Sequence, residues 1–354
     1  MTLTRRRFRL SRFNIDPLDE NELEAYCSFS NTIRQEAQPE DPPRSLESYR
    51  RNFEGWKLFD DVIFDLWLAR EGNLVVGDCL SRITLREDNR HLVFVSISVL
   101  APYRREGLGR CLLKQAASFA RANDRTLMMG YTTDRVPSGA GFARRLGAEA
   151  GQLSHTNQLV LAELDCDLLE NWCALGQSSA QEYRLGEWTS SYPEEELEEI
   201  AALQETMNTE PRDDLQIEDE KITPEMLRQY EEYNARQGTE RWSLHARHRV
   251  TGALVGYTEV FWHPETPQTL WQGDTAVVPS HRGHGLGKWL KATMLRKVQA
   301  ERPQILRIRT GNADSNGAML AINHRLGFKP YIAETVWQLG VDRVERFLAG
   351  EQGS

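Results

Sequence analysis

The sequence predicts an α+β protein with an α/β three-layer architecture. We expect two tandem domains, each a mixed, mostly antiparallel twisted sheet flanked by helices. Three observations predict this: one motif occurs twice, hairpin-like strand segments precede each copy, and an amphipathic helix follows each copy. The length of 354 residues also suits two domains of ordinary size.

The repeated motif has the form Val-x-x-x-x-Arg-x-x-Gly-Leu-Gly. It reads VLAPYRREGLG from Val99 to Gly109 and VVPSHRGHGLG from Val277 to Gly287. From residue 99 to residue 277 the offset is 178 residues, about half of the chain. That spacing indicates a duplicated domain and not a short solenoid repeat.

Similar elements surround the two copies. Short segments rich in β-branched and apolar residues lie upstream, with turns at Glu71-Gly72 and Thr251-Gly252. We expect strands at 65–70, 73–77, 79–85 and 92–99 in the first half, and at 242–246, 254–261 and 270–278 in the second. Downstream of each loop we expect a helix, a strand at 126–131 or 305–310, and a short helix that ends at Gly147 or Gly327 with a left-handed glycine cap.

The domain boundaries follow from this repetition. We expect domains at 1–167 and 183–342, a linker at 168–182 and a polar tail at 343–354. The linker is placed where Gly176-Gln-Ser-Ser179 has a flexible composition.

Composition excludes several classes of protein. The net charge of -9 argues against nucleic-acid or membrane-surface binding, and no apolar run is long enough for a membrane span. The five cysteines are scattered and no pair has C-x-x-C spacing, so neither a disulfide framework nor a metal site is indicated. His245, His248, His281 and His284 lack the third ligand and the helical spacing of a zinc site. We therefore expect a cytoplasmic protein, monomeric or homodimeric, without a metal.

The motif has the chemistry of an anion site. Glycines let the backbone approach a ligand closely, and the start of the following helix presents unpaired N–H groups. Arg104 or Arg282 can add a positive charge, so a pyrophosphate is the ligand that fits. Neither copy ends in the Gly-Lys-Ser/Thr of a Walker loop, and neither has the G-x-G-x-x-G spacing of a dinucleotide fold.

With the hairpins before it and the Leu-Gly cap after it, the motif resembles the loop of the GCN5-related N-acetyltransferase superfamily, in its tandem two-domain form. The resemblance implies that each loop binds the pyrophosphate of coenzyme A and that the preceding strand binds the pantetheine arm. In the second copy it implies binding by Val277, Val278, Arg282, Gly283, His284, Gly285, Leu286, Gly287, Lys288 and Asn316. In the first copy it implies binding by Val99, Leu100, Arg104, Arg105, Glu106, Gly107, Leu108, Gly109 and Arg110.

The resemblance also implies direct attack of an amine on the acetyl-CoA thioester, which needs a base. Asp274 and Glu259 are carboxylates within apolar strands of the second half, and we expect Asp274, or else Glu259, to be the base. Alternatively, Asp274 only caps or hydrogen-bonds neighbouring loops. The tyrosine that often protonates the leaving thiolate is replaced by Asn323 in one half and Ala143 in the other.

The two halves differ in ways that favour chemistry in the second. Ser96 stands at the position of Asp274, and Val136 at that of Asn316. We therefore expect an acetyl-CoA-dependent N-acetyltransferase that acts on a small-molecule amine in its C-terminal domain. The N-terminal domain would bind coenzyme A without turnover or complete the acceptor cleft. A non-catalytic acyl-CoA sensor and a protein N-acetyltransferase remain alternatives.

Overall fold

The computed structural model describes residues 8–179, 181–189 and 191–350. Its chain separates into two compact units. Unit 1 takes the chain up to Leu153, then residues 214–218, and then the chain from Glu334 onward; unit 2 takes residues 154–213 and 219–333. Each unit therefore draws on both halves of the sequence.

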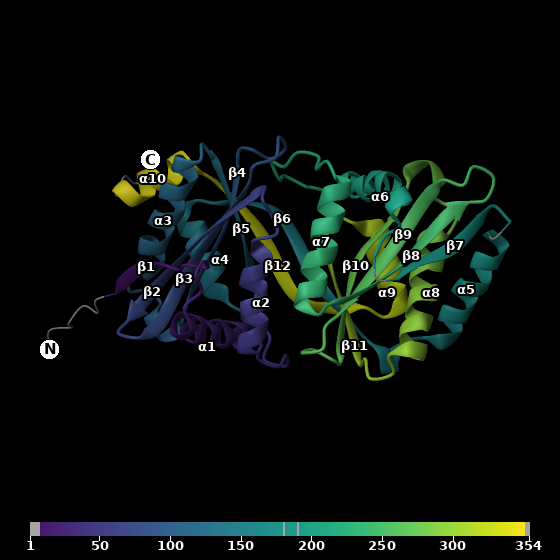
Figure 1. The fold of residues 1–354 in the computed structure, drawn as a ribbon, viewed down its shortest axis with the longest axis horizontal. Coiled ribbons are helices and arrows are strands. Elements are labelled where there is room, and N and C mark those ends of the chain that lie inside the picture. The colour runs from purple at the N-terminus through teal and green to yellow at the C-terminus, as the bar shows by residue number, and fades with distance from the viewer. Residues whose placement is uncertain (1–7, 180, 190, 351–354) are drawn as a thin grey trace. The chain divides into compact units, whose positions relative to one another are not determined.

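The sheet of unit 1 follows the order β1-β2-β3-β4-β5-β12 (Figure 1). The parallel pair is β4–β5, and the other neighbours run antiparallel. Its strands are β1 (Arg9–Arg12), β2 (Val62–Glu71), β3 (Leu74–Thr84), β4 (Leu92–Val99), β5 (Leu127–Thr133) and β12 (Lys329–Gly340).

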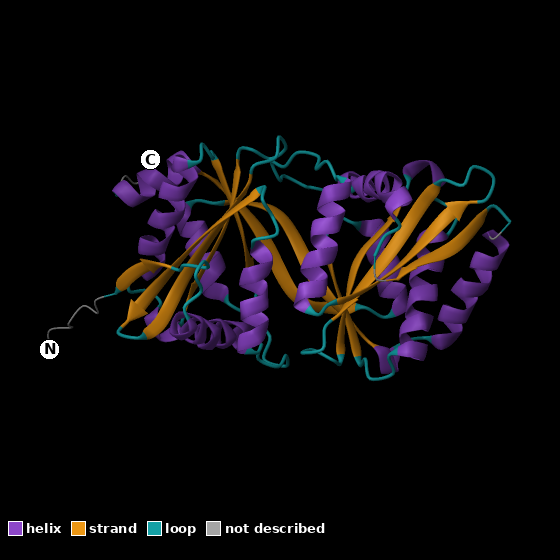
Figure 2. Ribbon diagram, in the orientation of Figure 1, coloured by secondary structure: helices purple, strands orange, loops and turns teal. Residues whose placement is uncertain are grey.

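Helices cover both faces of this sheet because its strands are apolar on both sides. Val75 packs against α1 (Glu20–Ala37) and α2 (Leu46–Trp56), whereas its neighbour Val76 packs on the opposite face against α3 (Leu108–Ala122). Helix α10 (Val341–Ala349) joins α3 in the same apolar cluster, and α4 (Pro137–Leu146) contacts both α10 and β5. The unit thus has the three layers that the sequence predicts (Figure 2).

Unit 2 repeats this arrangement with the order β6-β11-β10-β9-β8-β7. Its strands are β6 (Glu149–Val160), β7 (Tyr183–Thr189), β8 (Glu240–His248), β9 (Leu254–Trp262), β10 (Thr269–Val277) and β11 (Arg307–Ala313). One face carries α5 (Cys166–Ser179), α8 (Leu286–Glu301) and α9 (Gly317–Leu326); the other carries α6 (Leu197–Gln204) and α7 (Pro224–Gln237). Short 3-10 turns are η1 (Ala101–Tyr103), η2 (Leu161–Glu163), η3 (Glu194–Glu196), η4 (Glu205–Thr209) and η5 (Pro279–His281).

The two halves exchange their last strand and helix. Residues 154–160 of β6 pair with β11, and residues 334–340 of β12 pair with β5. The helix after each strand follows it: α5 packs against α8 through Leu169 and Trp172, and α10 packs against α3 through Val341 and Val344. Each unit is therefore completed by the closing strand and helix of the other half.

This exchange corrects the expected boundaries. The expected linker, 168–182, is mostly helix α5, whose Leu169 and Trp172 are buried. The expected polar tail, 343–354, begins inside α10, where Val344 is fully buried; its residues 351–354 lie outside the described part of the chain. The division into 1–167 and 183–342 fails because the sheet edge of each unit is covered by a segment of the other half.

None of the helices formed by the described residues has the length and apolar character needed to span a bilayer.

Candidate functional site

The parallel strands of each unit pair only at their beginnings. In unit 2 the β10–β11 ladder covers Thr269↔Arg307 to Trp271↔Arg309, although both strands continue beyond it. In unit 1 the β4–β5 ladder covers Leu92↔Leu127 to Phe94↔Met129. Each sheet therefore opens between its parallel strands, and the backbone along the opening is free to bind an extended ligand.

The strand before each opening has fewer backbone N–H groups available to a ligand than the resemblance implies. The N–H of Val278 donates to Val255 O at 2.9 Å, and that of Leu100 donates to Val76 O at 3.0 Å, so both amides belong to the sheet. Because N–H groups alternate in direction along a strand, the amides of Val277 and Val99 are the ones that face the opening. The backbone donors expected at Val278 and Leu100 are thus corrected to their predecessors.

The loop after each strand has the conformation of an anion site. Gly107 (φ +86°) is the N-cap of α3, and Gly285 (φ +77°) is the N-cap of α8; in unit 2, Gly283 also has a positive φ, +84°. No side chain caps either helix, so the first N–H groups stay available. A Cβ added at any of these glycines would meet nothing within 4 Å. The loops therefore fit a pyrophosphate in both conformation and space.

The arginine of each loop is held differently. Arg282 Nε donates to Val277 O at 3.0 Å, and its Nη2 donates to the neutral hydroxyl of Thr209 at 2.6 Å. Arg104 Nε donates to Val99 O at 2.9 Å, but its guanidinium also binds Glu36 through both terminal nitrogens. A bidentate carboxylate neutralises Arg104, whereas Arg282 keeps its charge for an anion.

Several residues expected at the cofactor serve the fold. Leu108 and Leu286 are buried in the two cores, and Asn316 caps α9 by accepting from Met319 N at 3.2 Å. Arg110 bonds the Leu348 carbonyl at the end of α10, and the Nζ atom of Lys288 lies 5.8 Å from the ring centroid of Trp172 in α5. These two cations therefore contact the exchanged helices.

A β-bulge distinguishes unit 2 from unit 1. The β9–β10 register shifts between Gln272 and Thr275, which places Gly273 and Asp274 in the bulge. The matching β3–β4 ladder runs without a shift from Arg82↔Phe94 to Gly77↔Val99. Bulges re-aim side chains and are common beside active sites. A Cβ on Gly273 would lie 2.7 Å from the Phe261 ring, so any larger residue here would force a neighbouring side chain to move.

The bulge brings Asp274 close to Glu259. The hydroxyl of Tyr257 donates to Asp274 Oδ2 at 3.2 Å, and that of Ser243 donates to Glu259 Oε2 at 3.5 Å. Burial, and then the charge of Asp274, raises the pKa of Glu259 to about 8 against the opposing effect of Arg241. Burial also raises the pKa of Asp274, while the bond from Tyr257 lowers it. The pair therefore retains a proton near neutral pH.

Glu259 gives a prediction about stability. The unfolded carboxyl loses its proton near its ordinary pKa of about 4.3, whereas the folded one keeps it up to about pH 8. Between these values the folded state binds more protons, so stability falls as pH rises. Glu259→Gln removes this loss, and the melting temperature of the variant should rise relative to the wild type from about pH 5 to about pH 8.

Thermal unfolding followed by circular dichroism across that range measures the difference. The exposed Glu195→Gln is the matched control and should show a constant offset. A constant offset for Glu259→Gln as well would contradict the raised pKa.

Unit 1 has a different buried carboxyl, which the sequence analysis missed. Asp78 stands opposite Ser98 on β4, where Tyr257 stands opposite Ala276 in unit 2. Its Oδ1 accepts from Ser98 N at 3.1 Å, and burial raises its pKa to about 7. Asp78 therefore binds the strand backbone, and the position of Asp274 holds Ser96.

The position at which the family often has a proton-donating tyrosine holds a buried residue in both units. Asn323 is fully buried and donates to Asn312 Oδ1 at 2.8 Å, and Ala143 lies in the core of unit 1. The histidines also make structural contacts: His281 Nδ1 lies 3.1 Å from the Tyr183 hydroxyl, and His245 stacks on Trp188.

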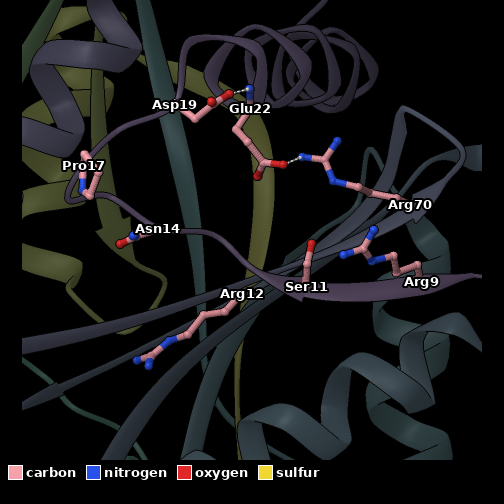
Figure 3. A pocket seen from close by; sticks show the side chains of 8 residues that line it. All are labelled: Arg9, Ser11, Arg12, Asn14, Pro17, Asp19, Glu22 and Arg70. Atoms are coloured by element: carbon pink, nitrogen blue, oxygen red, sulfur yellow. Dashed lines mark hydrogen bonds and ion pairs between the residues drawn. The ribbon is translucent and has the colours of Figure 1, made fainter.

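A cavity of about 280 Å³ lies in unit 1 beside β1, β2 and the start of α1 (Figure 3). Most of its charged groups pair with protein: Arg70 binds Glu22 at 2.9 Å, Arg12 binds Asp65 at 2.6 Å, and Asp19 caps α1. It is lined by Arg9, Ser11, Arg12, Asn14, Pro17, Asp19, Glu22 and Arg70. None of these belongs to either loop or to the carboxylate pair, so we do not place the site here.

In each unit the sheet opens between its two parallel strands, and a pyrophosphate-type loop follows the first of these strands. Together these two features define the class of an acyl-coenzyme A-dependent transferase. The model of the acetyltransferase (GNAT) family matches residues 30–148 and 195–328, which together make up more than half of the chain. The chain therefore belongs to this family. It is an N-acetyltransferase that uses acetyl-CoA and acts on an amine acceptor.

Solved structures share the fold. A tandem GNAT protein from the clavulanic acid biosynthesis pathway is 24% identical with a TM-score of 0.76; the match covers 95% of this chain and 99% of that one. A GCN5-related N-acetyltransferase from Sphaerobacter thermophilus is 13% identical with a TM-score of 0.62, over 94% and 96% of the two chains. No curated protein sequence matches this chain significantly.

Proposed function

We propose that the protein acetylates a small-molecule amine and that the chemistry takes place in unit 2. The observation that carries this proposal is the bulge in β10, which places Asp274 beside the opening of the sheet. Unit 1 has an unbroken β4 and a serine at the equivalent position. Its loop arginine is also neutralised by Glu36.

In this proposal the residues of unit 2 have separate roles in cofactor binding and proton transfer. The loop amides at 283–287 and Arg282 would hold the pyrophosphate, and the amide of Val277 would hold the extended arm. When bound, acetyl-CoA supplies the acetyl group as an activated thioester. Asp274 accepts the proton of the acceptor ammonium, and Tyr257 orients the Asp274 carboxylate. Glu259 stays protonated at neutral pH, so the carboxyl pair carries a single negative charge, that of Asp274.

Unit 1 keeps an intact loop, with Gly107 as the N-cap of α3. We propose that this unit binds coenzyme A without turnover.

The non-catalytic sensor is the second candidate, and the buried Asn323 favours it because the usual proton donor is absent. Release of free thiol from acetyl-CoA, measured across a panel of small amines, tests the proposal. We expect at least one amine to accelerate release well above hydrolysis. Tight binding of acetyl-CoA with no acceleration by any amine, or by peptide N-termini and lysines, would favour the sensor. Acceleration by peptides alone would favour a protein acetyltransferase.

A further inference from the structure

The cavity of unit 1 contains charged groups that the proposed acetyl transfer does not use. It lies beside β1, β2 and the first turn of α1 and has a volume of about 280 Å³ (Figure 3). Arg9 and Arg70 stand directly opposite each other in the β1–β2 ladder, so both project from the same face of the sheet. Like charges in this position repel each other, and the pair therefore needs negative charge close by.

Arg70 is only partly compensated by the protein. Its side chain is 12% exposed, and its Nη2 lies 2.9 Å from Glu22 Oε1. This ion pair is not aligned as a hydrogen bond, because within the described part of the chain the buried Nε and Nη2 of Arg70 have no hydrogen-bond partner. Glu22 therefore balances the charge of Arg70 but leaves two buried donors unsatisfied. That costs free energy unless a molecule in the cavity accepts from them.

Arg9 is the exception among the charged groups of the cavity. Of the residues that the structure describes, none forms an ion pair or a hydrogen bond with its guanidinium. Arg12, three residues along β1, projects from the opposite face, points away from Arg9 and Arg70 in Figure 3, and binds Asp65. Arg9 thus contributes a positive charge that the protein does not balance.

Two neutral donors lie beside these guanidinium groups. Ser11 projects from the same face of β1 as Arg9, and Figure 3 shows its hydroxyl next to the Arg9 side chain. Asn14 Oδ1 accepts from Asp16 N at 3.2 Å, which leaves the Nδ2 amide of Asn14 to donate. The cavity is therefore rich in donors that suit an anion.

The carboxylates at the cavity limit the charge of that anion. Glu22 pairs with Arg70, and Asp19 accepts from Glu22 N at 2.9 Å as the N-cap of α1. They repel a doubly charged anion such as sulfate or phosphate, whereas a carboxylate carries one charge and matches the fork of a guanidinium. Because ligand sites of drug-sized molecules begin at about 300 Å³, the acid must be small.

We propose that this cavity is a binding site for a small monocarboxylic acid, held by Arg9 and Arg70 with Ser11 and Asn14 as further donors. The carboxylate lies between the two guanidinium groups, offsets their repulsion and accepts from Arg70 Nε. All of these residues belong to unit 1. The inference is therefore independent of the chemistry proposed for unit 2.

Titration of sodium acetate and of sodium lactate into the full chain tests the site. The readout is the ¹H–¹⁵N signal of each arginine Nε group, recorded at slightly acid pH, where these protons exchange slowly with water. The signals of Arg9 and Arg70 are identified by their loss in Arg9→Gln and Arg70→Gln. We expect at least one of the two acids to shift both signals along the same saturable curve.

Arg9→Gln should weaken binding of that acid about ten- to hundredfold, followed at the Arg70 signal, because a charge-assisted pair is lost. Arg90→Gln is the matched control: it removes another exposed arginine of unit 1, outside the cavity, and should leave the affinity unchanged. Both side chains are exposed, so both variants should keep their fold, which melting curves check.

Three results would overturn the inference. One is the absence of a saturable shift of the Arg9 signal with either acid. Another is equal weakening in Arg9→Gln and Arg90→Gln, which would mean that only the overall charge attracts the acid. The third is tighter binding of sulfate than of both acids, which would assign the cavity to a doubly charged anion. Because acetyl-CoA is absent from the titration, none of these results bears on the chemistry proposed for unit 2.

Discussion

Replacing Gly285 with leucine is expected to abolish acetyl transfer, whereas the same change at Gly107 should leave most of it. Gly285 has φ +77° and is the N-cap of α8, so an L-residue there costs about 1–2 kcal/mol of backbone strain. Its Cβ would project into open space beside the helix N-terminus, where a pyrophosphate has to approach the N–H groups. The side chain would therefore exclude the ligand without a clash inside the protein.

Gly107 is the matched position, with φ +86° and equally open surroundings. Both variants carry a similar backbone strain, so a difference in turnover identifies the loop that binds the reacting acetyl-CoA. Initial rates of thiol release with an accepted amine provide the measurement. Loss of turnover in Gly107→Leu with turnover retained in Gly285→Leu would assign the chemistry to unit 1.

Asp274→Asn should lower kcat/KM about 100- to 10,000-fold, the usual contribution of a general base. Asparagine keeps the size of the side chain but cannot accept the proton. In the wild type, kcat/KM should rise with pH as Asp274 ionises, with a midpoint above the ordinary aspartate value because burial raises its pKa. Tyr257→Phe removes a bond that lowers this pKa, so the midpoint should move to higher pH.

The pH dependence of kcat/KM reflects the charged and polar groups around Asp274 and Glu259. The bond from Tyr257 lowers the pKa of Asp274, Arg241 lowers that of Glu259, and the charge of Asp274 raises the pKa of both Glu259 and Glu210. Ser96→Ala, the equivalent change in unit 1, is the control and should not alter the profile. A pH profile for Asp274→Asn with the wild-type midpoint would show that another group is the base.

Much of the fold can be predicted from local patterns in the sequence. The repeated motif correctly predicted both loops, the helices after them and the hairpins before them, because these features depend on residues close together in the sequence. Gly77 was misinterpreted as a break between two strands, whereas β3 runs through it from Leu74 to Thr84. That glycine is needed for close packing, since a Cβ would lie 3.0 Å from Ser98 O and 3.2 Å from Leu112.

The exchange of β6 and β12 had no local signal. Both strands follow equivalent short helices and both present an edge that suits either sheet, so the sequence pattern does not say which partner each one takes. Contacts between distant segments were missed for the same reason. Glu36 beside Arg104 and Thr209 beside Arg282 lie 68 and 73 residues from their partners. Asp274 and Glu259, by contrast, stand out in the sequence because carboxylates are unusual in apolar strands, and their role as base stays a prediction.

The exchanged strands also affect how the chain is made. Unit 1 contains almost all of the first 153 residues, yet its sheet lacks β12 and its α3 face lacks α10 until the ribosome has added residues up to about 349. Unit 2 meanwhile uses β6 and α5, which emerge early and have no completed sheet to join. Although domains generally fold in order during synthesis, unit 1 cannot reach its final form before α10 leaves the ribosome, and unit 2 cannot do so before residue 333. The nascent chain must keep two unfinished sheet edges from pairing wrongly throughout its elongation.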